Sequence, residues 1–157
     1  MDTIKNQDSL NLLLMGNNPI ELSSILGKIK DSQNKGIITE IAFDIKSLLD
    51  RLLNFTPNYI VIDDNIGRKE LHEALNELHQ NRKTRNIPVT VLKNSNYEES
   101  NSAPSVLDYL LKQNLSAESL FSSIRNSLRF RKTQLYLYKA YKNRKKHLES
   151  VVSAGAV

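Results

Sequence analysis

The stretch PNYIVID at positions 57–63 holds four consecutive apolar residues, begins with a proline and ends on Asp63. A short unbroken apolar run bounded by turn residues is typical of a strand that is buried on both faces. Similar runs occur at 10–15 (LNLLLM), 36–42 (GIITEIA), 87–92 (IPVTVL) and 106–111 (VLDYLL). The sequence therefore predicts five strands.

The segments between these runs carry apolar residues at helical spacing, and they predict helices at about 20–32, 45–53, 69–82 and 116–128. Residues 94–104 are instead polar and have no apolar period that would bury a helix face. Alternating strands and helices predict an α/β domain with a five-stranded, doubly wound parallel sheet. In such a sheet, functional groups collect at the carboxyl ends of the strands.

The composition excludes several kinds of chemistry. The chain has 157 residues, enough for one domain with an appendage, and it contains no cysteine and no tryptophan. A disulfide scaffold, a cysteine-ligated metal centre and a cysteine nucleophile are therefore excluded. No apolar stretch approaches the length of a membrane span or a signal-peptide core, so we expect a soluble, cytoplasmic protein.

Charged residues stand at or just after predicted strand ends, among them Asp63, Lys93 and Lys112. A carboxylate at such an edge could accept a phosphoryl group or ligate a metal, but Asp63 and Asp64 could equally cap the loop and helix that follow. Lys112 could converge on Asp63 as a counter-charge for an anion, or it could be a solvated lysine. The residue types alone leave both interpretations open.

Three separated segments resemble the receiver domains of two-component response regulators: 57–63, 84–89 (TRNIPV), and 108–112 (DYLLK) with 115–118 (LSAE). The resemblance covers residues 10–131. It implies a flavodoxin-like fold with strand order 2-1-3-4-5. It also implies that Asp63 is the phospho-acceptor, that the carbonyl of Asn65 helps to hold magnesium, that Tyr109 is the aromatic switch residue and that Lys112 pairs with the phosphoryl group.

The sequence departs from the family pattern after the first strand. Gly16-Asn17 stands where the family has an acidic pair, so the two carboxylates that would offset a magnesium ion are missing. Asp64 does not replace them well, because successive side chains at a strand end point in different directions.

Further departures lie near the last two strands. Lys93 replaces the family's serine or threonine, Gln113 replaces its proline, and residues 94–104 leave only a degenerate fourth helix. We therefore expect an atypical or pseudo-receiver in which Asp63, Lys93 and Lys112 form a permanent ion cluster. The alternative is a competent receiver that a histidine kinase phosphorylates at Asp63. Either is a signalling domain of a bacterial phosphorelay rather than an enzyme.

The net charge of +5 is concentrated near the C-terminus. Residues 125–149 hold nine basic residues and one acidic residue, so this segment carries +8 while the other residues together carry −3. We expect disordered residues at 1–9, the receiver-like domain at 10–131, a basic helical extension at 132–150 and a disordered tail at 151–157.

The helical extension has three interpretations. It could be a solvated helix, it could dock a signalling partner or a second copy through Leu135, Tyr138 and Tyr141, or it could contact nucleic acid through its basic residues. We favour docking, because the apolar residues exceed what a lone solvated helix should expose. One stripe holds Leu128, Leu135 and Tyr138, and another holds Phe130, Leu137, Tyr141 and Leu148. Lys142 and Lys145 interrupt any clean heptad, so a long coiled coil is not expected. Without a helix-turn-helix motif, we do not expect sequence-specific DNA binding.

Overall fold

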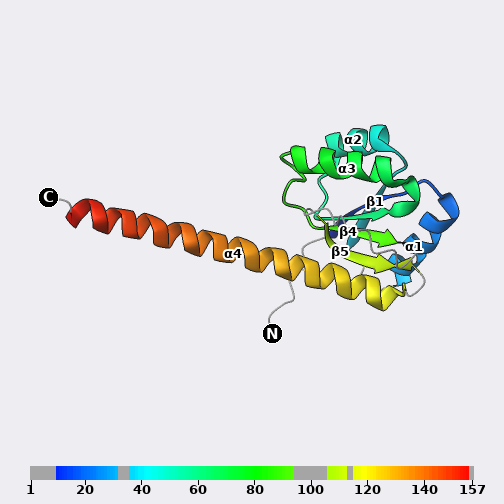
Figure 1. The fold of residues 1–157 in the computed structure, drawn as a ribbon. Helices are drawn as coiled ribbons and strands as arrows, with labels where there is room; N and C mark the ends of the chain where they lie inside the picture. Colours follow the sequence, from blue (N-terminus) through cyan, green and yellow to red (C-terminus); the bar gives the residue numbers. More distant parts are fainter. Residues whose placement is uncertain (1–9, 32–35, 94–105, 113–114, 156–157) are drawn as a thin grey trace.

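The computed structural model describes residues 10–31, 36–93, 106–112 and 115–155 (Figure 1). Its five strands form one parallel sheet in the order β2-β1-β3-β4-β5, which confirms the predicted fold class and strand order. The elements, in chain order, are β1 (Leu10–Met15), α1 (Pro19–Asp31), β2 (Ile37–Ala42), α2 (Ile45–Asn54), β3 (Tyr59–Asp63), the short 3-10 helix η1 (Asp64–Ile66), α3 (Arg68–Gln80), β4 (Val89–Lys93), β5 (Val106–Leu111) and α4 (Ala117–Gly155).

Alternating side chains of the central strands build two separate cores. Leu13, Met15, Ile60 and Ile62 pack with apolar residues of α2 and α3 on one face of the sheet. Leu12, Leu14, Tyr59 and Val61 pack with residues of α1 and α4 on the other face. Figure 1 shows this three-layer arrangement, with α2 and α3 above the sheet and α1 and α4 below it. Burial on both faces explains why β1 and β3 are continuous apolar runs.

The connection after β3 needs a glycine. Asp63 is the last residue of β3, and the chain then forms η1 before Gly67, whose φ of 97° lies in the region that other residues rarely adopt. The sequence predicted this segment only as a loop. Because the turn is tight, α3 begins at Arg68 and its N-terminal end stays near the end of β3.

A buried hydroxyl cluster joins the last helix to the sheet. The Tyr59 hydroxyl of β3 is hydrogen-bonded to the Thr90 hydroxyl of β4, and it donates to the Ser127 Oγ of α4 at 3.4 Å. The side chains of Tyr59 and Thr90 are fully buried, and Ser127 is nearly so. The cluster therefore fixes α4 against two neighbouring strands.

Removing the Tyr59 hydroxyl tests this link. Tyr59→Phe is expected to lower the free energy of unfolding by about 1–3 kcal/mol, because Thr90 loses a partner where water cannot replace it. Urea denaturation measures the loss, and Tyr136→Phe on the exposed part of α4 is the matched control with no expected change. An equal effect of the two substitutions would contradict the link.

α4 continues far beyond the domain. It has 39 residues and is about 58 Å long at 1.5 Å per residue. Its first turns bury Leu120 and Ile124 against the sheet, whereas every described side chain from Lys132 to Val152 is exposed. Figure 1 shows this part of α4 projecting from the domain. We call residues 132–155 the arm.

The predicted C-terminal boundary of the helix was wrong. We expected a disordered tail from residue 151, but α4 includes Val151 to Gly155. These residues contain no proline, and a glycine at position 155 is a common helix terminator, which accounts for the later end. The predicted disordered N-terminus at 1–9 and the predicted degenerate fourth helix at 94–104 lie outside the described residues.

Candidate functional site

Asp63 and Lys112 meet at the carboxyl end of the sheet. Asp63 ends β3, the central strand, between β1 and β4, and its side chain is fully buried. Lys112 directly follows β5, and its ammonium group forms an ion pair with Asp63 Oδ1. The Lys112 side chain is 15 % exposed. Strand order brings the two residues together although 49 positions separate them in the chain.

A third charged group, Glu21, completes the cluster. Asn18 caps the start of α1 by accepting hydrogen bonds from the backbone N–H groups of Ile20 and Glu21, which fixes the first turn of the helix beside β3. Glu21 Oε2 then accepts a hydrogen bond from Lys112 Nζ at 2.8 Å. One ammonium group therefore binds two carboxylates, and we call Glu21, Asp63 and Lys112 the ion cluster.

Two asparagines surround the ion cluster. The backbone N–H of Asn65 donates to Asp63 Oδ1 at 3.0 Å, and the Asn65 side-chain amide donates to Glu21 Oε2 at 2.6 Å. The side-chain amide of Asn17 donates to the backbone carbonyl of Asn65 at 3.3 Å. Asn17 and Asn65 thus hold the loop after β3 in place. The second oxygen of Asp63, Oδ2, is buried and has no hydrogen-bond partner among the described residues.

Burial and ion pairing shift the pKa values of the three charged groups in different directions. Burial raises the pKa of Asp63, and its hydrogen bonds with Lys112 and Asn65 only partly oppose this. The hydrogen bond from Lys112 lowers the pKa of Glu21. Burial alone would lower the pKa of Lys112, but its bonds with Asp63 and Glu21 outweigh that effect and raise it. Lys112 is therefore firmly charged, and Asp63 is the group that most resists ionisation.

Gly16 lies in a closely packed position. A Cβ atom on Gly16 would lie 2.8 Å from Cδ2 of Leu22 and 3.3 Å from Cβ of Asp63. The first distance is too short for carbon atoms, and Leu22 is itself buried in the core below α1. The chain therefore has no room for the first member of the acidic pair unless Leu22 moves.

Several oxygen atoms at this edge that could ligate a magnesium ion are already engaged. Magnesium prefers carboxylate oxygens and water in octahedral geometry. Here Asp63 Oδ1 and Glu21 Oε2 already bind an ammonium group, and the Asn65 carbonyl accepts a hydrogen bond from Asn17. Among the described residues, no group of three or more acidic, histidine or cysteine side chains could hold a metal.

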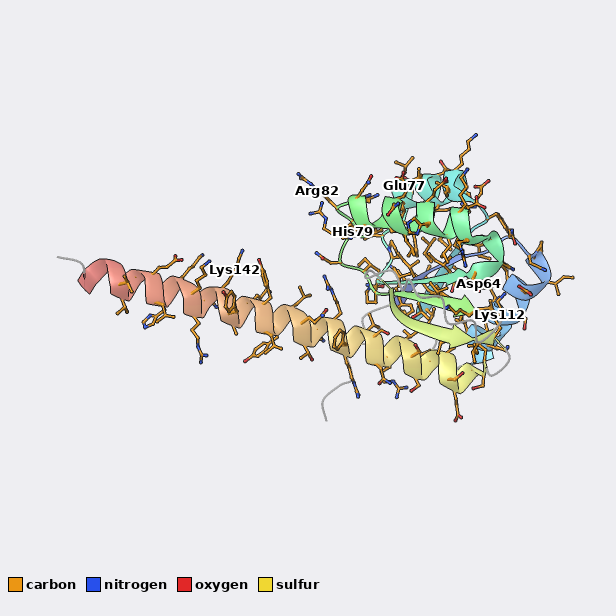
Figure 2. All side chains as sticks on the ribbon, in the orientation of Figure 1. Asp64, Glu77, His79, Arg82, Lys112 and Lys142 are labelled. Atoms are coloured by element: carbon orange, nitrogen blue, oxygen red, sulfur yellow. The ribbon has the colours of Figure 1, made fainter. Side chains whose placement is uncertain are left out.

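The positions of the other predicted site residues are as follows. Lys93 ends β4 and is partly exposed, and Glu21, which we did not expect, joins Asp63 and Lys112. Tyr109 lies in β5 opposite Val91, and its side chain is outside the described set. The docking residues Leu135, Tyr138 and Tyr141 are exposed on the arm, away from the ion cluster. Figure 2 shows Lys112 and Asp64 at one end of the sheet and Lys142 far along the arm.

The sequence analysis did not identify Glu21. Its position in the first turn of a helix explains a glutamate without any further role, because carboxylates stabilise helix N-termini. The available signal was that this helix begins at the same sheet edge as Asp63. An acidic residue one turn beyond the missing acidic pair could have been considered as its substitute.

No protein-family model and no curated protein sequence matches this chain. Solved structures do match. The receiver domain of a sensor histidine kinase from Pseudomonas aeruginosa, with a magnesium ion coordinated in its active-site cleft, has a TM-score of 0.65 at 16 % identity and covers 76 % of this chain and 98 % of its own.

Two further receiver structures superpose similarly. The signal receiver domain of an HD-domain protein from Pseudomonas fluorescens has a TM-score of 0.66 at 13 % identity, with 79 % of this chain and 98 % of that chain covered. The chemotaxis response regulator CheY4 of Vibrio cholerae has a TM-score of 0.63 at 15 % identity, with 75 % and 98 % covered. At sequence identities this low, the superpositions show a shared fold and nothing more.

Proposed function

We propose, from the receiver fold, that this chain is a receiver-like signalling module of a two-component system in which magnesium-dependent phosphorylation of Asp63 is impaired. The observation that carries the proposal is that the ammonium group of Lys112 binds two carboxylates at once, those of Asp63 and Glu21. In a phosphorylating receiver, this lysine pairs with the phosphoryl group. Here an internal carboxylate already takes that place.

Charge balance supports this proposal. Two carboxylates and one ammonium leave the ion cluster with one negative charge when all three groups are ionised. Transfer of a phosphoryl group would form a bond from a carboxylate oxygen of Asp63 to phosphorus, break the bond from phosphorus to the donor, and add further negative charge. The closely packed Gly16 and the neutral Asn17 supply nothing to offset that charge.

The second candidate is a competent receiver that a histidine kinase phosphorylates at Asp63. One observation favours it: Asp63 Oδ2 is buried without a hydrogen-bond partner among the described residues, so one oxygen is not engaged by Lys112 or Asn65. A carboxylate oxygen in that condition is available as a nucleophile.

Incubation with acetyl phosphate and magnesium distinguishes the two candidates. We expect the intact mass of the purified chain to stay unchanged, with Asp63→Asn as the control for any other modified residue. Glu21→Gln removes the competing charge from Lys112 and is the variant most able to gain a phosphoryl group. A stable gain in the wild-type chain that is lost in Asp63→Asn would overturn the impaired candidate and support the competent one.

Signalling partners complete the proposal. We infer that the chain acts in the cytoplasm by docking a histidine kinase or another signalling protein, without nucleic acid, and that it is not an enzyme. The exposed apolar residues of the arm, among them Leu135, Tyr138 and Tyr141, support docking through the last helix. Across the part of the chain that the structure describes, no helix is apolar enough over a sufficient length to cross a bilayer.

A further inference from the structure

An apolar stripe runs along one side of α4 and its arm. Phe130, Leu137, Tyr141, Leu148 and Val151 follow one another at intervals of 7, 4, 7 and 3 residues, and each is between 53 % and 64 % exposed. These intervals are those of heptad positions a and d, which face a partner helix in a coiled coil. Val151 joins the stripe because α4 continues to Gly155. We call these five residues the apolar stripe.

Three of the six positive charges of the arm lie on the opposite side of the helix. Counting 100° per residue, Lys132, Lys139 and Lys146 point about 160–200° away from the centre of the apolar stripe. In the heptad they occupy position f, which is remote from a partner helix. These three charges therefore do not prevent two copies of the stripe from meeting.

Two polar residues interrupt the stripe, Gln134 at an a position and Arg144 at a d position. In a parallel pair, equivalent positions meet, so Arg144 would face Arg144 of the second copy inside the seam. In an antiparallel pair, a positions meet d positions, so Arg144 would face Gln134 of the second copy. Only the antiparallel arrangement avoids burying two like charges together.

We propose that two copies of this chain pair through the apolar stripe as antiparallel helices. In this register Phe130 of each copy packs on Leu148 of the other, and Leu137 packs on Tyr141. The Gln134 side-chain carbonyl already accepts a hydrogen bond from Arg131 at 3.1 Å, and its second lone pair accepts one from Arg144 of the other copy. Four apolar residues of each copy thus meet apolar residues of the other, and the two polar interruptions satisfy each other, while Val151 falls opposite Ser127, which is buried against the sheet, and takes no part in the seam.

The same register brings a pair of like charges to the edge of the seam. Arg131 and Lys145 of the second copy occupy facing e positions, where solvent and salt can reach them. Added salt therefore strengthens this dimer. Binding of the basic arm to nucleic acid or to an acidic partner would instead weaken as salt is added.

The self-association of the full chain tests the proposal. Light scattering and sedimentation should show a concentration-dependent dimer that tightens between about 50 and 500 mM salt. Tyr141→Lys is expected to raise the dimer dissociation constant at least about tenfold, because it places a charge in the seam. Tyr136→Lys is the matched control, since Tyr136 is an exposed tyrosine of the same arm outside the stripe. A chain that stays monomeric at high protein concentration, at both the low and the high salt concentration, would overturn the proposal.

Disulfide trapping tests the orientation, since the chain contains no cysteine of its own. A mixture of Phe130→Cys and Leu148→Cys chains should form the mixed disulfide, because these positions face each other across the antiparallel seam. Leu148→Cys alone should not cross-link, since the two copies of position 148 are then about 27 Å apart along the axis. Efficient cross-linking of Leu148→Cys alone would show a parallel pair and overturn the orientation.

This inference does not depend on the chemistry of the ion cluster. Asp63→Asn should dimerise with the same affinity as the unmodified chain, because Asp63 lies at the sheet edge and not on the arm. A failure to dimerise would leave the phosphorylation result unchanged, and the two proposals can therefore fail separately.

Discussion

Replacing Lys112 with methionine is expected to lower the free energy of unfolding by about 3–5 kcal/mol at pH 7, the usual cost of removing one partner from a buried ion pair. Asp63 is fully buried and would lose its ion pair with the ammonium group of Lys112. Methionine keeps most of the lysine volume, so a packing defect contributes little. Urea denaturation with a fluorescence or circular-dichroism readout measures the loss.

The pH dependence identifies the cause of this loss. Burial raises the pKa of Asp63, and removal of Lys112 raises it further. A carboxyl group with a raised pKa loses stability as the pH rises from its ordinary pKa to the raised one, so the deficit of Lys112→Met should shrink as the pH falls through the raised pKa. Lys112→Met combined with Asp63→Asn should cost less than the sum of the single changes. An equal deficit at every pH, with additive single changes, would mean that Lys112 acts only through packing.

Restoring the first acidic residue of the family pattern is expected to damage this chain. Gly16→Asp should lower the free energy of unfolding by about 1–3 kcal/mol through overlap with Leu22 alone, and the new charge beside Asp63 adds to the cost. Gly16→Ala separates the two contributions, because it introduces the same Cβ atom without the charge. Denaturation midpoints of the two variants measure them.

A compensating variant completes this experiment. Gly16→Asp combined with Leu22→Ala removes the overlapping Cδ2 atom, although it leaves a smaller core side chain. The steric argument predicts that adding Leu22→Ala costs less in the Gly16→Asp background than in the unmodified chain. A Gly16→Asp chain as stable as the original would show that Leu22 moves aside freely, and the edge would then have room for an acidic pair.

Local patterns predicted most of the fold because its two buried faces require apolar strands. The runs that became β1 and β3 are uninterrupted since neither face of these central strands reaches solvent. The predicted end of this helix at residue 150 was wrong. Nothing in Val151 and Val152 stops a helix, and α4 ends only at Gly155.

The candidate site was predicted only in part. Asp63 and Lys112 could be paired from the sequence because each directly follows or ends a strand, and the strand order brings those ends together. Glu21 could not be separated from an ordinary helix-capping carboxylate without the direction of its side chain. The steric need for Gly16 depends on where Leu22 lies, and no sequence spacing reports that distance.

The continuity of α4 gives small movements of the domain a mechanical consequence. A single helix runs from Leu120, packed on the sheet, to Gly155, and Ser127 is tied to Tyr59 near the point where the helix leaves the domain. From residue 132 to residue 155 the arm measures about 35 Å. A tilt of about 10° at its base would move its far end by roughly 6 Å, more than one helical turn. The arm thus acts as a lever. A small rotation at the buried hydroxyl cluster would become a displacement of several ångströms for a partner bound at its tip.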